Sequence, residues 1–166
     1  MAGERGRRTA QGDVVELSGS YVFGLPQEKL WDALMDPEVV GGCVPGVRAF
    51  EALGGGAFSY EISVRVGPVS ASYTGKIEAI EQVRPESYRL VVSGAGGRTT
   101  VRGTGAVTLA PAGEGATTLT FKGDVQVAGM LARVGQRMLT TVARSQINQF
   151  FECLRVRAAP PQGLEV

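Results

Sequence analysis

Apolar and polar residues alternate along much of this chain, and the alternation defines its strands. In residues 13–23 one face carries Val15, Leu17, Tyr21 and Phe23, and a period of two is typical of a half-buried strand. Six more stretches carry strand signals and are separated by short glycine- or proline-containing turns: 47–53, 57–66, 69–80, 86–94, 98–109 and 117–127. Short turns join antiparallel neighbours, so the pattern predicts a seven-stranded antiparallel sheet.

Helical spacing is found in three other places. Residues 27–35 follow Pro26 and place Leu30, Trp31 and Leu34 on one face, and a second short helix is predicted to begin at Asp36-Pro37. The chain then closes with one long helix predicted over about 130–157. The sheet needs its apolar face covered, and this helix is the only predicted element large enough to cover it.

The predicted fold class is therefore α+β: one sheet wrapped around a long C-terminal helix, with two short helices after the first strand. The 166 residues suit one domain, which we place at 13–157. Residues 1–12 are predicted to form a flexible basic tail, and residues 158–166 a short flexible end.

The predicted inner face of the sheet carries no charge. Five successive strands between residues 57 and 127 place no Asp, Glu, Lys or Arg on the apolar side, and histidine is absent from the chain. General acid–base catalysis needs a titratable group in the pocket, and this face offers only tyrosine hydroxyls. The pattern favours a container over a catalyst, and it indicates no metal or other cofactor.

Glycine occurs 24 times, and six glycines fall on the inner face of strands: Gly19, Gly75, Gly94, Gly103, Gly105 and Gly123. They are expected either to allow the sheet to coil and the helix to pack closely, or to leave a hollow that receives an apolar ligand. For the second case, the predicted lining residues are Tyr60, Ile62, Tyr73, Leu90, Val92, Val107, Phe121, Leu131, Val134 and Met138.

Strand alternation also predicts where such a ligand would enter. The loops 41–46, 66–69, 94–98 and 127–130 are expected at the end of the sheet where the last helix begins. They are small or apolar, and their candidate mouth residues are Val44, Pro45, Pro68 and Met130. Ordinary surface turns are the alternative interpretation, since glycine is common in any turn.

The charge of the chain is nearly balanced, with 17 basic and 16 acidic residues, which argues against a nucleic-acid-binding protein. The last helix is nevertheless basic, with five arginines against one glutamate between residues 130 and 157. At about 100° per residue, Arg133, Arg137, Arg144 and Arg155 fall within one stripe of this helix. We take Arg133, Arg137 and Arg144 as candidate contacts to an anionic membrane or an acidic partner, with a solvated face as the alternative.

The two cysteines, Cys43 and Cys153, belong to no metal-binding cluster. We expect two partly buried thiols, although a disulfide between them stays open. The N-terminus has no apolar run that would make a secretory signal, and no stretch is long and apolar enough to span a membrane. The expected location is the cytoplasm, with a possible peripheral position at the inner face of the membrane.

Two segments carry a family resemblance. Residues 31–46 (WDALMDPEVVGGCVPG) and 121–138 (FKGDVQVAGMLARVGQRM), together with the 148–151 segment NQFF, resemble the carbon monoxide dehydrogenase G-subunit (CoxG-like) family. This family belongs to the START/Bet v 1-like (SRPBCC) superfamily, whose fold is the helix grip, and the likeness covers about residues 14–155. It implies an accessory protein of a CO-dehydrogenase-type molybdenum hydroxylase that assists its membrane association, with a lipid or quinone as a plausible ligand.

Three functions are compatible with these observations. The leading hypothesis is a non-catalytic protein that binds a hydrophobic small molecule. A cyclase- or hydrolase-like enzyme of the same superfamily would have to use Tyr21, Tyr60, Tyr73 or Tyr88. A protein–protein adaptor would bind its partner through the arginines of the last helix.

Overall fold

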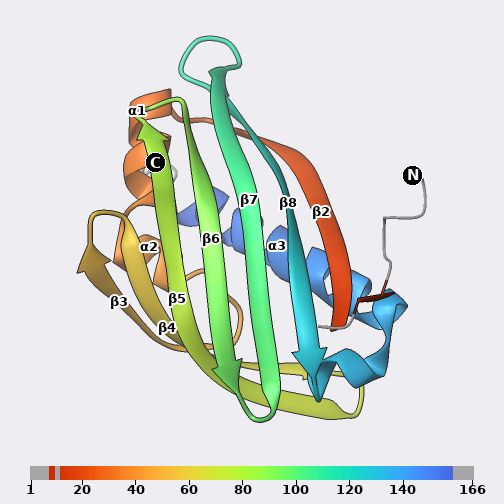
Figure 1. Cartoon of the computed structure of the whole chain (residues 1–166). Helices are drawn as coiled ribbons and strands as arrows, with labels where there is room; N and C mark the ends of the chain where they lie inside the picture. Colours follow the sequence, from red (N-terminus) through yellow and green to blue (C-terminus); the bar gives the residue numbers. More distant parts are fainter. Residues whose placement is uncertain (1–7, 10–11, 159–166) are drawn as a thin grey trace, which may run out of the picture.

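The computed structural model describes residues 8–9 and 12–158 of the chain. Seven long strands and a two-residue strand form one antiparallel sheet in the order β1-β2-β8-β7-β6-β5-β4-β3 (Figure 1). The strands are β1 (Arg8–Thr9), β2 (Gly12–Phe23), β3 (Val47–Gly54), β4 (Ala57–Val66), β5 (Val69–Val83), β6 (Ser87–Gly96), β7 (Thr99–Pro111) and β8 (Thr117–Gly129). The helices are α1 (Gln27–Leu34), α2 (Pro37–Gly41), the 3-10 helix η2 (Leu131–Val134) and α3 (Gln136–Ala158).

The predicted α+β fold is confirmed, with seven long antiparallel strands, two short helices after the first of them and a closing helix. Two differences concern the ends of the chain. Arg8 and Thr9, placed in the flexible tail by the sequence, pair with Asp13 and Gly12 of β2, and Ala158 is still helical. The rest of the two predicted flexible ends lies outside the described residues.

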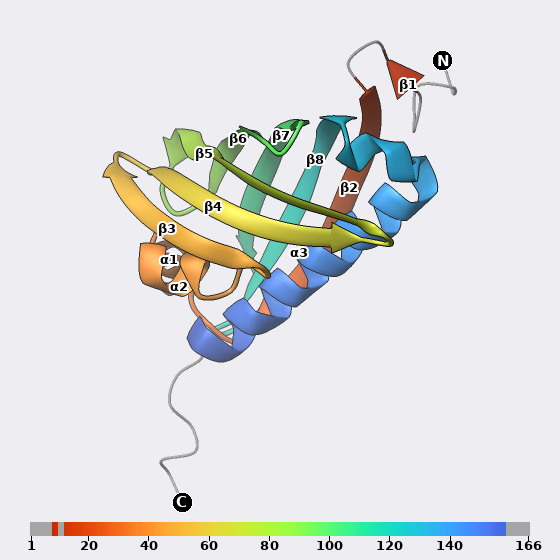
Figure 2. The ribbon, with the colours of Figure 1, turned by 90° about the horizontal axis from the view of Figure 1, so that it is seen from below.

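The sheet curves around α3, which crosses its concave face (Figure 2). Part of the core lies between α1, the last turns of α3 and the strands beneath them, where Phe23, Leu30, Leu119 and Leu154 are almost completely buried. Each such side chain contributes about 1.5–3 kcal/mol by leaving water. Trp31 of α1 is 3% exposed and packs edge-on against Tyr88, with 5.3 Å between the ring centroids.

Side-chain hydrogen bonds attach the segment around α1 to the neighbouring strand ends. The hydroxyl of Thr117 donates to the carbonyl oxygen of Leu25 at 2.7 Å, and Thr117 is completely buried. The amide of Gln27 donates to the carbonyl oxygens of Pro85 (3.2 Å) and Leu109 (3.1 Å). These bonds hold the β2–α1 connection and α1 on the ends of β7 and β8.

The closing helix is not continuous, and the predicted single helix over 130–157 is wrong in this respect. The 3-10 helix η2 ends at Gly135, which has a φ of 97°, and α3 begins at the next residue. Glycine adopts such a backbone at no steric cost, whereas an L side chain does not. At the other end of η2 the buried hydroxyl of Thr99 accepts a hydrogen bond from the backbone N–H of Leu131 at 3.2 Å.

The inward glycines bring strands and tyrosine rings close together. Gly75 faces Gly94 across the β5–β6 pair, and Gly105 faces Gly123 across the β7–β8 pair. A Cβ atom on Gly75 would lie 2.7 Å from the Tyr60 hydroxyl, and one on Gly94 would lie 2.8 Å from Cδ1 of Tyr73. Larger residues would therefore displace these rings or the facing strand, which favours the coiling and packing interpretation of the glycines.

The two cysteines form a disulfide, so the expectation of two free thiols is wrong. Cys43 follows α2 and Cys153 lies in the last turns of α3, and their Cα atoms are 5.4 Å apart. The residues are separated by 110 positions in sequence, and no local sequence motif predicts that they pair. The bond ties the α2–β3 loop to the end of α3.

Candidate ligand-binding site

Two apolar chambers lie between the concave face of the sheet and α3. Each has a volume of about 230 Å³, and no Asp, Glu, Lys or Arg lines either one. Both are lined by Gln146 and Ile147 of α3, so they adjoin at the middle of the helix. No glycine lines either chamber, so the hollow is made by the distance between sheet and helix and not by the inward glycines.

The first hollow, which we call the aliphatic chamber, lies toward the start of α3. Apart from Tyr73 and Gln146, its walls are aliphatic: Val15, Leu17, Ile62, Val64, Val66, Val92, Val101, Val125, Val127, Leu131, Leu139, Val142, Ala143 and Ile147. These residues come from β2, β4, β6, β7, β8, η2 and α3. Branched side chains at alternate positions of each strand give this smooth, uncharged wall.

The second hollow, the aromatic chamber, lies toward α1 and α2. Its lining includes six aromatic rings, from Phe50, Phe58, Tyr88, Phe121, Phe150 and Phe151. The rest of the wall is Leu34, Met35, Val40, Val44, Pro45, Ile77, Ala79, Leu90, Val107, Gln146 and Ile147. Flat rings on several sides make this chamber suited to a planar molecule, because aromatic pairs favour offset or edge contacts.

A larger hollow of about 810 Å³ lies among β5, β6, β7 and β8, and exposed residues such as Thr74, Thr100 and Arg102 contribute to its lining. Its lining mixes polar side chains with glycine, alanine and valine: Thr74, Gly75, Ser93, Gly94, Ala95, Thr100, Val101, Arg102, Gln126 and Ala128. Because this lining includes hydroxyl groups, an amide and the charged Arg102, the hollow does not share the uncharged, apolar character of the two chambers.

The tyrosine hydroxyls are neutral groups in this structure. Burial is the main cause that raises the pKa of Tyr21, Tyr60, Tyr73 and Tyr88 above the ordinary value. The hydroxyl of Tyr21 donates to Oδ1 of Asn148 at 2.7 Å, and that of Tyr60 donates to the carbonyl oxygen of Ser93 at 2.9 Å. Among the described residues the hydroxyls of Tyr73 and Tyr88 have no hydrogen-bond partner, so each can donate one bond to a bound molecule.

Seven of the ten predicted lining residues lie on chamber walls. Ile62, Tyr73, Val92 and Leu131 line the aliphatic chamber, and Leu90, Val107 and Phe121 line the aromatic chamber.

Tyr60, Val134 and Met138 lie elsewhere. The hydroxyl of Tyr60 lies close to Gly75 and Gly94 and donates to the backbone of β6. Val134 belongs to η2 and packs against the core, because the chain turns at Gly135. Met138 is 41% exposed.

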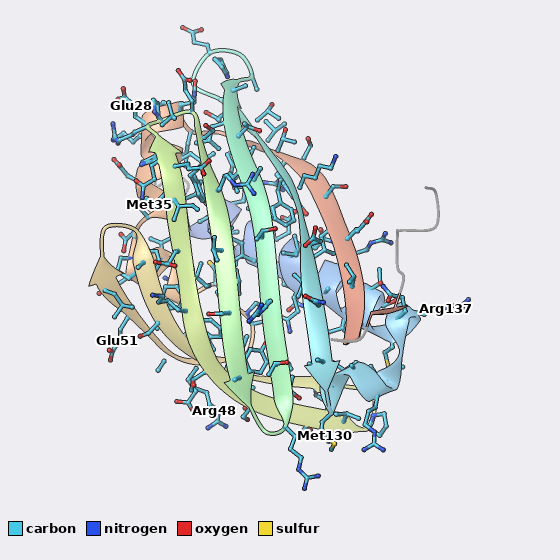
Figure 3. The ribbon with its side chains drawn as sticks, in the orientation of Figure 1. Glu28, Met35, Arg48, Glu51, Met130 and Arg137 are labelled. Carbon is cyan, nitrogen blue, oxygen red and sulfur yellow. A yellow bond between two sulfur atoms is a disulfide. The ribbon has the colours of Figure 1, made fainter. Side chains whose placement is uncertain are left out.

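The predicted mouth is divided between two places. Pro68 and Met130 lie at the end where α3 begins, and the N–H of Met130 donates to the carbonyl oxygen of Arg98 at 2.8 Å (Met130 is labelled in Figure 3). Val44 and Pro45 instead line the aromatic chamber. Their loop runs beside the middle of β4, where Ser63 N–H donates to the carbonyl oxygen of Gly46 at 2.9 Å, so their placement at the strand ends is wrong.

The predicted arginine stripe is also divided. Arg133 lies in η2, beyond the break at Gly135, whereas Arg137 and Arg144 are exposed on α3 (Arg137 extends outward in Figure 3). Arg155 is engaged within the protein, since it pairs with Glu152 at 3.0 Å and lies 5.6 Å from the centre of the Phe23 ring. The prediction of one stripe of four arginines on a single helix is therefore wrong, because that prediction assumed an unbroken helix.

The sequence did not single out Gln146 or most of the aromatic chamber. Gln146 stands at an apolar position of the α3 pattern, and that exception was a visible signal. Phe50, Phe150 and Phe151 are aromatic residues at helix or edge-strand positions, which strand alternation alone does not assign to a cavity.

The described part of the chain contains no cluster of three or more Cys, Asp or Glu side chains placed to hold a metal ion. None of its helices combines the length and the hydropathy needed to cross a membrane.

Comparison with known proteins identifies the family. The model of the carbon monoxide dehydrogenase G-subunit (CoxG) family matches residues 19–159. The chain belongs to the CoxG family. A search among curated proteins finds no match for this CoxG-family chain.

Solved structures agree with the helix-grip fold. A conserved protein from Geobacillus kaustophilus is 30% identical, with a TM-score of 0.81 over 87% of this chain and 95% of its own. Two more distant structures show that the fold is shared with the START superfamily. They are the Zhui aromatase/cyclase from Streptomyces sp. R1128 (15% identity, TM-score 0.66, 87% and 93% covered) and a START superfamily protein from Mycobacterium smegmatis (14%, 0.64, 86% and 96%).

Proposed function

We propose that this CoxG-family protein is a non-catalytic binding protein for a hydrophobic small molecule, a lipid or a quinone. It serves as an accessory of a CO-dehydrogenase-type molybdenum hydroxylase and assists the association of that enzyme with the membrane. The observation that carries the proposal is the pair of adjoining, uncharged chambers between the sheet and α3. Their combined volume of about 460 Å³ lies in the usual range for small-molecule sites.

The chemistry of the walls supports binding without catalysis. General acid–base catalysis at neutral pH needs a group whose pKa lies near 7. Tyr73 and Tyr88 are the titratable side chains on the chamber walls, and burial raises the pKa of both. Their hydroxyls therefore stay protonated and can orient a ligand without accepting a proton from it.

The end where α3 begins has the features of a membrane contact. Met138 is 41% exposed there, Arg133 and Arg137 are exposed nearby in sequence, and Leu131 lines the aliphatic chamber. Arginines near an anionic lipid surface contribute roughly 1 kcal/mol each, and apolar side chains between them enter the headgroup region. A ligand leaving the membrane at this end would reach the aliphatic chamber first.

The test is uptake of a prenylquinone and of a fluorescent phospholipid from phosphatidylglycerol vesicles, measured on protein re-isolated by size exclusion. Ala143→Phe places a ring in the aliphatic chamber and is expected to reduce bound ligand at least about tenfold, since the ring occupies volume that the ligand would need. Ala106→Phe, on the exposed face of β7, is the matched control and is expected to bind as wild type. Absence of uptake by wild type, or equal uptake by Ala143→Phe, contradicts the proposal.

The membrane step is tested separately. Arg133→Ser/Arg137→Ser is expected to slow uptake from anionic vesicles at low salt and to leave uptake from detergent solution unchanged. Arg102→Ser, exposed on β7, is the control. Equal rates for the two variants from anionic vesicles would remove this end of the molecule as the membrane contact.

A further inference from the structure

One polar residue interrupts the apolar stripe of α3 that faces the sheet. Leu139, Val142, Phe150 and Leu154 follow one another at helical spacing, and Gln146 occupies the position between Val142 and Phe150. Its side chain lines both chambers, at the place where they adjoin. A leucine or methionine at this position would complete the stripe.

The other side-chain amides of α3 are used within the protein. Gln136 donates to the carbonyl oxygen of Val14, Asn148 accepts from the Tyr21 hydroxyl at 2.7 Å, and Gln149 donates to the Ser145 hydroxyl at 3.0 Å. Gln146 has no hydrogen-bond partner among the described residues, although it is half-buried between two apolar walls. The amide lines both chambers and no group of the described residues occupies it, so it is available to hydrogen-bond a molecule bound there.

The two chambers constrain what that partner is. An amide offers two donor hydrogens and one acceptor oxygen at the point where the chambers adjoin, whereas the hydroxyls of Tyr73 and Tyr88 each belong to one chamber. One side of that point is lined by aromatic rings and the other by aliphatic side chains. The complementary molecule is apolar at both ends and carries an oxygen, as a carbonyl, ether or hydroxyl, between them.

We propose that Gln146 is the specificity-determining residue of this cavity and hydrogen-bonds an oxygen of the ligand where the chambers adjoin. The proposal rests on the proposed binding function and adds to it the residue that distinguishes oxygen-bearing ligands from plain hydrocarbons.

The test uses two probes of nearly identical shape, 2-acetylnaphthalene and 2-isopropenylnaphthalene, in which a carbonyl oxygen is exchanged for a CH₂ group. The measured quantity is the dissociation constant of the alkene divided by that of the ketone, so differences in general hydrophobicity cancel between variants. Gln146→Leu is expected to lower this ratio by about three- to tenfold, the loss of one neutral hydrogen bond. Gln149→Leu, on the exposed side of α3, is expected to leave it unchanged.

Gln146→Met serves as a second variant with an unbranched side chain of similar length. Both variants are expected to unfold at or above the wild-type temperature, because they remove an unpartnered polar group from an apolar position. The role of Gln146 is overturned if the ratio is unchanged in both Gln146 variants, or if it falls in Tyr73→Phe instead. Either result leaves the binding function intact. Failure of both probes to bind the wild-type protein overturns cavity binding itself, and the role of Gln146 with it.

Discussion

Removal of the Cys43–Cys153 disulfide is expected to destabilise the protein strongly. The perturbation is the double substitution Cys43→Ala/Cys153→Ala, which cuts the link between the α2–β3 loop and the end of α3 and leaves no thiol behind. The bond stabilises the native state mainly by restricting the unfolded chain. It therefore acts through the length of chain that it closes more than through its own contacts.

The magnitude follows from the 110 positions between the two cysteines. For a loop of about 100 residues the chain-entropy model gives roughly 4.7 kcal/mol, and measured losses for native disulfides are about 2–5 kcal/mol. Urea unfolding of a small domain has a slope of about 2 kcal/mol per molar. The unfolding midpoint of the double variant is thus expected about 1–2.5 M below that of the oxidised wild type.

The assay is equilibrium urea unfolding followed by far-ultraviolet circular dichroism, with and without a dithiol reductant. Wild type in reductant is expected to unfold near the midpoint of the double variant, and reductant should not affect the double variant. The single substitution Cys153→Ala should match the double one, since either removes the link. Midpoints that agree within about 0.3 M between oxidised wild type and the double variant would refute the reasoning.

Two further predictions concern the tyrosines and the helix break. The pKa of all four tyrosines is raised in the fold above the unfolded value of 10.0, so their contribution to stability is full below pH 10 and is lost as the pH rises above it. Phenolate absorbance and urea midpoints between pH 9 and about 11.5 check this, and ionisation of the native tyrosines near pH 10 would contradict it. Gly135→Ala meets no atom within 4 Å but forces an L side chain to a φ of 97°, so we expect a loss of about 1–2 kcal/mol in urea unfolding. A loss under about 0.3 kcal/mol would show that the chain re-folds locally around the new side chain.

Most of the strands could be predicted because they show a period of two over eight or more residues, bounded by glycine or proline, whereas the edge strand β3 shows no such alternation and was bounded only by its turns. The break before α3 was missed because the apolar spacing continues across Gly135, and spacing alone does not report a positive φ. The signal was the glycine itself, inside an otherwise helical pattern. The pairing of Arg8 and Thr9 with β2 involves two residues, too few for any periodicity.

For the chamber walls, the sequence could predict only which residues lie on the inner face of the sheet. Alternation correctly assigned Ile62 and Val92 to the inner side of the sheet. It does not indicate whether an inward side chain borders a cavity or packs against other atoms. It therefore could not distinguish a residue that lines a cavity from one, such as Tyr60, whose hydroxyl lies against the glycines of neighbouring strands. The sequence could not decide whether the two cysteines form a disulfide, since 110 positions separate them and tertiary structure alone brings them together.

The contact between Trp31 and Tyr88 gives the molecule a reporter of its own. Trp31 is the single tryptophan of the chain, and the Tyr88 ring that it meets edge-on also forms part of the aromatic chamber wall. Indole emission thus samples one chamber through a single intervening ring, while the aliphatic chamber, whose wall includes neither residue, lies beyond direct contact. The intrinsic fluorescence of the unmodified protein can therefore distinguish a ring lodged beside α1 from a hydrocarbon chain lodged beside η2, without any added label.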